Sequence, residues 1–335
     1  MNKTFIIAEA GANHDRKFKQ ALELVDLAVV SGCDAVKFQT YSSDTLYRKN
    51  TPDFAGYKDI NNLIKGIEMP REWQPQLKSY CDGKGIEFMS TPFDEKAVEE
   101  LVGIGVNRLK ISGFESTDFR FVEMVASSKL PLVISLGIGF PANYLGKIFD
   151  ICEKHSNELT LLHCNNAYPT PTSDLNLKSM FSSKSLRFDC KVGLSDHSTS
   201  ILTPSLAVAL GAQVIEKHFT LDRNLIGPDH KFALEADELQ KMVEYIRFTE
   251  EACGVKDSHF TKSEEKFRFA MRSIVAKKQI KKGDILSEDN ITTKRPCFEY
   301  DIPAINYEFA IGQKVSADFD VDQAISGLEI YTERF

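Results

Sequence analysis

The chain has 335 residues, enough for one large domain and a smaller one. Hydrophobic residues make up 42% of it, which predicts a sizeable core and excludes wholesale disorder. The formal net charge of −7 disfavours a nucleic-acid-binding protein, although a few local lysines can still bind a small anion. The seven cysteines are scattered without a CxxC pair, which predicts neither a disulfide framework nor a structural zinc site.

Membrane and export signals are not evident in the sequence. The first residues, MNKTFIIAEAG, contain too short an apolar run for a signal peptide. No apolar segment of about 18 residues follows. We therefore expect a cytoplasmic protein that has neither a membrane nor a nucleic acid as its partner.

Eight short apolar runs, each closing in small or polar residues, predict eight β-strands. Apolar residues with helical spacing separate several of them; Leu239, Met242, Val243 and Ile246, for example, fall on one face. A strand followed by a helix, repeated over residues 1–254, predicts a (β/α)₈ TIM barrel. A doubly wound open sheet is the alternative, but no GxGxxG loop follows the first strand. The predicted strands are 4–9, 35–40, 87–91, 108–112, 132–137, 159–165, 191–197 and 214–220.

Three further segments differ from this pattern. Residues 41–70 form an unusually long polar connection, and a connection of that length is more often a functional lid than a plain linker. Residues 255–272 are charged and predict a linker with one helical turn. Residues 273–335 contain short apolar pieces, from SIVA at 273–276 to LEIY at 328–331, broken by Gly, Pro and Asp. This predicts a small domain rich in β-structure and turns.

Every predicted strand brings a hydrogen-bonding or ionisable group to its C-terminal end, where barrel enzymes have their active sites. Because alternate side chains of a strand share a face, Glu216 and His218 lie on one face. Ser195 and His197 share a face in the same way. The other groups at this end are Glu9, Lys37, Gln39, Thr91, Lys110, Ser112, Ser135 and Asn166.

A single polar residue at a strand end is more often a cap or a solvated rim group than part of a site. The whole cluster is harder to explain in that way. An unpaired buried ion costs several kcal/mol, whereas a domain is stable by only about 5–15 kcal/mol. Two lysines, two glutamates and two histidines can converge only if they neutralise one another and a ligand. The cluster therefore predicts one shared binding site.

Two features of the cluster suggest what it binds. His197 and His218, on adjacent predicted strands, offer two imidazoles to one divalent metal, although a satisfied core histidine is an equally good explanation for either. Two protein nitrogens leave coordination positions open for water or a substrate oxygen, which suits a Lewis acid. Lys37 and Lys110 form a candidate cradle for a phosphate or a carboxylate, together with nearby hydroxyl groups. These hydroxyls belong to Thr91, Ser135 and Ser195.

Long motifs follow one another in order along nearly the whole chain. They are IIAEAGANH, VKFQTY, STPFD, HCNNAYPTP, GLSDHS and IEKHFTLDRNLIGPDHK, followed by SIVAKKQIKKGDILSEDNITTKRP. The first six resemble the N-acylneuraminate (sialic acid) synthase family, and the last resembles its C-terminal antifreeze-like (SAF) domain of the β-clip type. The resemblance implies condensation of phosphoenolpyruvate with an N-acylated mannosamine-type sugar. The expected products are a nine-carbon 2-keto-3-deoxy acid and phosphate, released by C–O cleavage.

The resemblance also implies roles for residues at matching positions. His197 and His218 would bind the metal, typically Mn²⁺, with Mg²⁺ or Co²⁺ as alternatives, and the charges of the strand 214–220 would belong to this site. Glu9 or Glu216 would orient the sugar aldehyde or act as the base. The residues holding phosphoenolpyruvate would be Lys37, Thr91, Lys110, Ser135, Asn166 and Ser195. Those around the sugar would be Glu9, Gln39, Glu115, Tyr168 and Asp229, joined by Arg295 from the neighbouring subunit of a domain-swapped homodimer.

One short segment departs from the family pattern. The family usually has serine three places after the lysine that corresponds to Lys110, but here Ser112 stands one place early and Gly113 occupies the usual serine position. Alternation then aims Ser112 at the barrel interior, and the phosphate meets the backbone N–H of Gly113 instead.

The identity of the acceptor sugar rests on conflicting cues. GPDHK and LLHC are similar to neuraminic and legionaminic acid synthases, whereas EWQPQLK, TYSSDTL and the Phe114–Glu115 pair are similar to pseudaminic acid synthases. We favour a neuraminate- or legionaminate-type product, with the altrose-configured diacetamido sugar of pseudaminic acid synthases as the alternative acceptor. Rival functions are a Schiff-base aldolase with Lys37 or Lys110 as nucleophile, a non-catalytic sugar-binding barrel, and a synthase of shorter keto acids from phosphorylated aldoses.

Overall fold

The computed structural model describes residues 3–53, 58–137, 139–181, 190–254 and 261–328. The chain divides into two compact units, Met1–Gly254 and Val255–Phe335. Each unit has its own buried apolar core.

Eight parallel strands form the sheet of the first unit. They pair in the order β3-β2-β1-β8-β7-β6-β5-β4. Within the described residues, only the neighbours β3 and β4 lack a backbone ladder, so the sheet is a nearly closed barrel. The predicted (β/α)₈ barrel is confirmed, and the open sheet is not. The strands are β1 Phe5–Gly11, β2 Ala35–Thr40, β3 Glu87–Pro92, β4 Leu109–Ile111, β5 Leu132–Leu136, β6 Leu159–Cys164, β7 Lys191–Asp196 and β8 Val214–His218.

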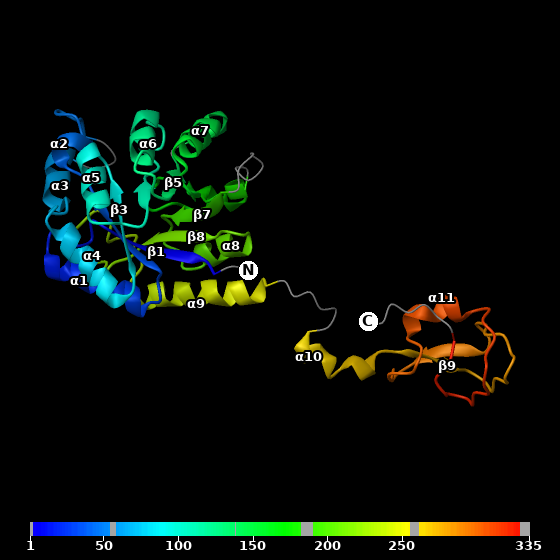
Figure 1. Cartoon of the computed structure of the whole chain (residues 1–335). Helices are drawn as coiled ribbons and strands as arrows, with labels where there is room; N and C mark the ends of the chain where they lie inside the picture. The colour runs from blue at the N-terminus through cyan, green and yellow to red at the C-terminus, as the bar shows by residue number, and fades with distance from the viewer. Residues whose placement is uncertain (1–2, 54–57, 138, 182–189, 255–260, 329–335) are drawn as a thin grey trace. The chain divides into compact units, whose positions relative to one another are not determined.

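Helices surround the strands (Figure 1). Local signals set their ends: the side chain of Asp94 accepts a hydrogen bond from Ala97 N at 2.7 Å where α5 begins, and Gly85, with φ of 73°, ends α4. Between β6 and β7 the described residues form only 3₁₀ turns, Thr172–Asp174 and Leu177–Phe181. The helices are α1 Phe18–Val30, α4 Trp73–Lys84, α5 Glu95–Gly103, α6 Phe119–Ala126, α7 Leu145–His155 (after a 3₁₀ turn, Ala142–Tyr144), α8 Thr203–Ala209 and α9 Ala236–Ala252.

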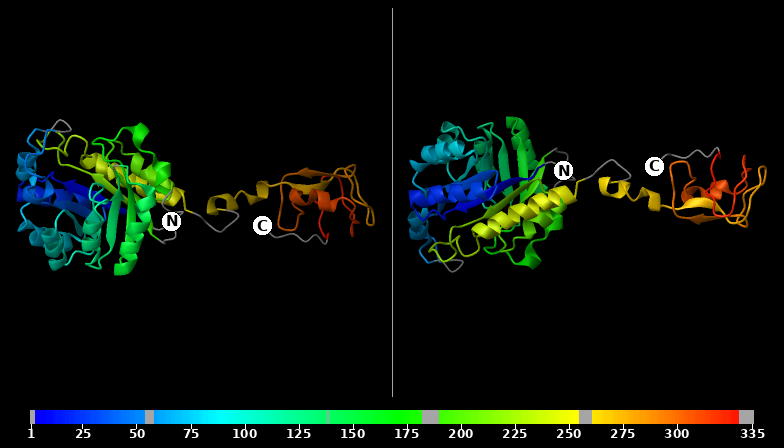
Figure 2. Two further views of the ribbon diagram at one scale, coloured as in Figure 1. Left: turned by 90° about the horizontal axis from the view of Figure 1, so that it is seen from above. Right: turned by 90° about the horizontal axis from the view of Figure 1, so that it is seen from below.

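The barrel interior is apolar at its N-terminal end. Ile7, Met89 and Leu162 are fully buried there and pack against three further inward-facing side chains. Helix α9 runs beside β1 (Figure 2, right), and Arg247 of α9 donates to the backbone oxygen of Thr4 at 2.9 Å. Since this end is filled with apolar side chains, the polar strand residues gather at the other end. The three further side chains are those of Ala35, Val133 and Val214.

The long connection after β2 contains two short helices, α2 Ser43–Leu46 and α3 Ile60–Ile67. The guanidinium of Arg16, which follows β1, donates to the backbone oxygen of Lys65 at 2.7 Å. The connection is therefore held to the loop after the first strand. Residues 54–57 of this connection lie outside the described residues, and its role as a lid stays a prediction.

The second unit is built around an antiparallel pair of strands, β9 Ser273–Ala276 and β10 Ile291–Lys294. Short helices α10 Lys262–Glu265 and α11 Tyr307–Ala310 and two 3₁₀ turns, Arg268–Ala270 and Ala304–Asn306, complete it. Elsewhere in this unit, isolated bridges such as Ile280 with Phe319 replace the expected strands. Residues 255–260 of the predicted linker, and all of the LEIY piece except Leu328, lie outside the described residues. Among the helices that the structure describes, none has the length and apolarity to cross a membrane.

Candidate active site

Strand register brings the predicted polar residues together. Glu9 in β1 is paired with Lys37 in β2 on one side and with His218 in β8 on the other. Ser195 in β7 is paired with Glu216 in β8. Paired residues of neighbouring parallel strands project from the same face of the sheet, so these side chains all point into the barrel.

They line a small cavity of about 40 Å³ at the C-terminal end of the strands. Twelve of the fifteen predicted site residues line it: Glu9, Lys37, Gln39, Thr91, Lys110, Ser135, Asn166, Tyr168, Ser195, His197, Glu216 and His218. Phe93, Ser112, Gly113 and Cys164 complete the lining.

Positive and negative charges alternate across this cavity. Lys37 Nζ lies 2.7 Å from Glu9 Oε2 and 3.6 Å from Glu216 Oε2. Lys110 Nζ lies 3.6 Å from Glu216 Oε1. All four side chains are buried. Because two cations face two anions, each charge has an opposite partner, which is what a buried ion requires.

The two carboxyl groups nevertheless differ in their protonation. Burial raises the pKa of Glu9 to about 7, although Lys37 acts in the opposite direction. Burial alone would also raise the pKa of Glu216, but Lys110 and Lys37 outweigh it and lower this pKa to about 2. Glu216 is therefore a fixed anion, while Glu9 gains and loses a proton near neutral pH. A pair of carboxyl groups with separated pKa values is typical of acid–base sites.

Hydroxyl groups engage the buried charges. Lys37 Nζ donates to Thr91 Oγ1 at 2.9 Å, and Lys110 Nζ donates to Ser135 Oγ at 2.8 Å. Ser195 Oγ donates to Glu216 Oε1 at 2.8 Å. Lysine and hydroxyl groups close together can bind an anion through charge and hydrogen bonds at once.

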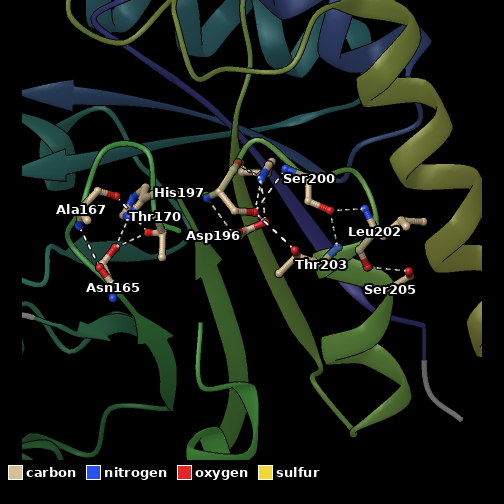
Figure 3. Close-up of polar contacts among 11 residues, drawn as sticks. Asn165, Ala167, Thr170, Asp196, His197, Ser200, Leu202, Thr203 and Ser205 are labelled. Atoms are coloured by element: carbon tan, nitrogen blue, oxygen red, sulfur yellow. Dashed lines mark hydrogen bonds and ion pairs between the residues drawn. The ribbon is translucent and has the colours of Figure 1, made fainter. Parts of the chain in front are cut away.

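The two imidazoles lie side by side, with ring centroids 5.4 Å apart. His197 Nδ1 is 2.6 Å from the backbone oxygen of Asn165, on the loop shown at the left of Figure 3, so Nε2 is its nitrogen left for a ligand. His218 Nδ1 is buried and has no hydrogen-bond partner among the residues that the structure describes. Burial lowers the pKa of His197 to about 4 and that of His218 well below its usual value, so both rings are neutral.

Neutral imidazoles with a free nitrogen fit a divalent metal. In the part of the chain that the structure describes, no group of three His, Cys, Asp or Glu side chains is placed to hold a metal ion. Two imidazoles would thus be what the described residues contribute to such an ion. Water or a substrate oxygen would then complete its coordination.

Asp229 borders the cavity from the loop after β8. Burial raises the pKa of Asp229, and its Oδ2 accepts from Ala12 N at 3.4 Å. Gly11 has a φ of +51°, and a Cβ there would lie 2.7 Å from Asp229 Oδ2 and 3.5 Å from Glu9 Oε1. Only glycine combines this backbone conformation with so close an approach. Asp229 therefore reaches the Glu9 side of the site.

The other two predicted residues outside the lining are Glu115 and Arg295. Glu115 contacts the hydroxyl of Ser112, which does line the cavity. Arg295 follows β10 in the second unit and is exposed there. The structure thus brings Glu115 next to the cavity, while a role for Arg295 in a barrel stays a prediction.

Lys217 does not belong to this site, which corrects the prediction made for strand 214–220. Its ammonium lies 2.6 Å from Asp196 Oδ2 and also contacts the backbone oxygen of Ser198. In Figure 3, Asp196 faces the residues that begin α8, whereas the neighbouring His197 faces Asn165. Successive residues of a strand point to opposite faces. The charge of Lys217 is therefore directed away from Glu216 and His218.

Sequence reasoning missed Phe93 and Cys164. Cys164 follows Leu162 by two residues on β6, so alternation alone could have placed it inside the barrel. Its Sγ lies 3.9 Å from His197 Nδ1, and burial raises its thiol pKa to about 11. Phe93 lies beyond the end of β3, where strand periodicity gives no signal.

Both parts of the chain match models of known protein families. Residues 24–258 match the model of the NeuB family, and residues 271–327 match that of the SAF domain. A pseudaminic acid synthase from Campylobacter jejuni (strain 81-176) is 38% identical, over 96% of this chain and 95% of that protein. An N,N′-diacetyllegionaminic acid synthase from Legionella pneumophila is 39% identical, over 87% of this chain and 85% of that protein.

A solved structure supports the same assignment. The crystal structure of N-acetylneuraminic acid (sialic acid) synthetase from Leptospira borgpetersenii, in complex with citrate, is 35% identical in sequence. The similarity covers 79% of this chain and 90% of that chain, with a TM-score of 0.73. The family predicted from the sequence motifs is confirmed.

Proposed function

The chain belongs to the NeuB family, and from this premise we propose that it condenses phosphoenolpyruvate with an N-acylated mannosamine-type sugar. The products are a nine-carbon 2-keto-3-deoxy acid and phosphate. The observation that carries the proposal is a small cavity with two buried lysines and two glutamates of alternating charge beside two neutral imidazoles. The reaction would take place in the cytoplasm.

Phosphoenolpyruvate is bound by the cationic side of this cavity. Lys37 and Lys110 supply positive charge, and the hydroxyls that contact them exchange part of their bonds for bonds to phosphate and carboxylate oxygens. Asn166 supplies an amide from the loop after β6. These hydroxyl groups are those of Thr91 and Ser135, and Ser195, which donates to Glu216, supplies a third hydroxyl.

His197 and His218 hold the divalent metal, for which Mn²⁺, Mg²⁺ and Co²⁺ are the candidates. When bound, such an ion supplies Lewis acidity to the carbonyl of the open-chain sugar. Around it, Tyr168 packs against His197 with ring centroids 4.2 Å apart and limits the movement of that imidazole. Gln39 and Asp229 face the sugar hydroxyls.

The two glutamates then divide the remaining chemistry. C3 of phosphoenolpyruvate attacks the sugar carbonyl carbon, whose oxygen takes up a proton from solvent to become a hydroxyl group, and positive charge develops at C2. Glu216, ionised at neutral pH, stabilises this charge. Water adds to C2 as Glu9 accepts its proton, a role suited to a carboxyl with a pKa of about 7. The tetrahedral carbon then expels phosphate by breaking the C2–O bond.

For the acceptor we propose a sugar that leads to a neuraminate- or legionaminate-type acid. The altrose-configured diacetamido sugar is the second candidate, because the similarity to a pseudaminic acid synthase has nearly the same identity, 38% against 39%, and covers more of the chain, 96% against 87%. We also propose a domain-swapped homodimer, in which the exposed Arg295 of one copy reaches the acyl group bound in the barrel of the other.

The proposal is tested by measuring phosphate release from phosphoenolpyruvate with Mn²⁺ and three acceptors. These are N-acetylmannosamine, 2,4-diacetamido-2,4,6-trideoxymannose and its altrose counterpart, each repeated with EDTA. We expect release with one acceptor, abolished by EDTA and restored by Mn²⁺. Phosphoenolpyruvate labelled with ¹⁸O at the bridging position should transfer the label to phosphate, as C–O cleavage requires. A different result would establish a Schiff-base aldolase: pyruvate would condense without release of phosphate, and borohydride would trap its imine on a lysine.

A further inference from the structure

In the turn after β4, residues 112–116, the hydroxyl group of Ser112 both donates and accepts a hydrogen bond. Ser112 Oγ donates to the carboxylate of Glu115 and accepts from Phe114 N at 3.2 Å. The turn is closed by two further bonds, from Ser116 N to Ser112 O at 3.1 Å and from Ser116 Oγ to Gly113 O at 3.0 Å. A hydroxyl has one proton to donate. Since that proton goes to Glu115, Ser112 has none left for a phosphate oxygen.

Gly113 leaves the space that the end of the Asn166 side chain occupies. A Cβ at this position would lie 2.8 Å from Asn166 Oδ1, 3.1 Å from Asn166 Nδ2 and 3.3 Å from the Cα of Gly137. A serine here would push Asn166 away from the place it occupies in the cavity. The order Ser112–Gly113 therefore suits both neighbours: Glu115 receives the hydroxyl of Ser112, and Asn166 fits beside Gly113 in its present position.

Glu115 itself lies between the cavity rim and the long connection after β2. Burial raises the pKa of Glu115, and the hydrogen bond from Ser112 acts against this. Burial and the nearby Glu115 also raise the pKa of Tyr47, which follows α2 in that connection. The Glu115 side chain is half-buried, and its contact with Ser112 joins it to the cavity lining.

We propose that Ser112 is a positioning residue that holds Glu115 at the sugar end of the cavity, while the phosphate end meets the backbone of Gly113. This inference rests on the proposed function. Glu115 accepts a hydrogen bond from a hydroxyl or amide N–H of the acceptor sugar, and Ser112 keeps the carboxylate in the orientation to do so.

The kinetic test compares Ser112→Ala, Ser112→Thr, Glu115→Ala and the double variant S112A/E115A. We expect S112A to raise the KM for the acceptor about tenfold, the usual effect of losing a hydrogen bond to a charged group. The KM for phosphoenolpyruvate should stay within about twofold, and S112T should restore the acceptor KM. The double variant should be no worse than E115A alone, because Ser112 acts only through Glu115. Additive losses, or a raised KM for phosphoenolpyruvate in S112A, would overturn the proposal.

A second variant tests the phosphate end of the cavity, and a titration of Glu115 tests its contact with Ser112 without measuring activity. Gly113→Ser should raise the KM for phosphoenolpyruvate by displacing Asn166; an effect on the sugar alone contradicts the assignment. In protein labelled with ¹³C-glutamate, the Glu115 signal is assigned with Glu115→Gln. Its titration midpoint should move to higher pH in S112A, because the hydrogen bond that favours the ionised form is gone. If the wild type turns over no acceptor, the proposed function fails, while an unchanged midpoint overturns the contact with Ser112 separately.

Discussion

Strands β7 and β8 carry two buried sets of charges, one on each face. On the inner face, Glu216 lies 3.6 Å from both Lys37 and Lys110. On the outer face, Lys217 lies 2.6 Å from Asp196, whose oxygens also accept from Ser198 N at 2.9 Å and Ser198 Oγ at 3.1 Å. Both sets are almost completely shielded from solvent.

Burial therefore does not distinguish a functional charge from a structural one in this protein; the completeness of the partners does. The outer pair has short contacts and a full set of hydrogen bonds. The inner set combines one short contact, Lys37–Glu9 at 2.7 Å, with two of 3.6 Å from the lysines to Glu216, and among the described residues His218 Nδ1 has no hydrogen-bond partner. Groups with unused bonding capacity are those that a ligand can complete. The comparison predicts that substitutions in the inner set lower catalytic activity, whereas substitutions in the outer set lower the free energy of unfolding.

The largest effect is expected for Lys37→Met. The variant loses the cation that contacts both Glu9 and Glu216 and that binds phosphoenolpyruvate. We expect kcat/KM to fall by a factor of about 10³, as when a central charge-stabilising donor is removed. Its free energy of unfolding should stay within about 2 kcal/mol of the wild type, because Glu9 can take up a proton. Phosphate-release kinetics and urea unfolding measure the two quantities; nearly normal turnover would place Lys37 outside the reaction.

The matched outer variant is Lys217→Met, which should have the opposite profile. Removing one partner of a buried ion pair leaves Asp196 unpaired and costs about 3–5 kcal/mol of unfolding free energy. Activity per folded molecule should stay within about twofold. The double variant K217M/D196N should regain most of the stability, since asparagine keeps an acceptor for Ser198 N without a charge. A tenfold loss of activity in folded K217M would break the distinction between the two faces.

A smaller effect is expected from a pair of serines on the same segment. Ser195→Ala removes the hydroxyl that donates to Glu216, and we expect about a tenfold loss of kcat/KM with little change in stability. Ser198→Ala removes a hydroxyl that contacts Asp196 and Thr203, and we expect a loss of about 1 kcal/mol in unfolding free energy with unchanged turnover. If the two variants changed activity and stability equally, the face on which a residue lies would not decide whether it serves catalysis or stability.

Much of the fold and site followed from local sequence patterns. Each of the eight barrel strands lies within two residues of its predicted limits, because apolar runs that end in polar residues mark buried parallel strands. Alternation and the rule that barrel sites lie at strand C-termini placed eleven of the twelve lining site residues together, whereas Tyr168 came from the family resemblance. These are properties of short segments, so the sequence by itself determined them.

Other features depended on distances between segments far apart in the chain. Glu9 and Glu216 are both strand glutamates, yet their pKa values separate because Glu216 faces two lysines from β2 and β4 and Glu9 faces one. The contact of Ser112 with Glu115 and the closeness of Gly113 to Asn166 arise in loops, where no periodicity guides the prediction. Lys217 was assigned to the wrong set because charge was read without the face it occupies. A pattern along one strand fixes the direction of a side chain, but only the closed barrel determines which other charges that side chain meets.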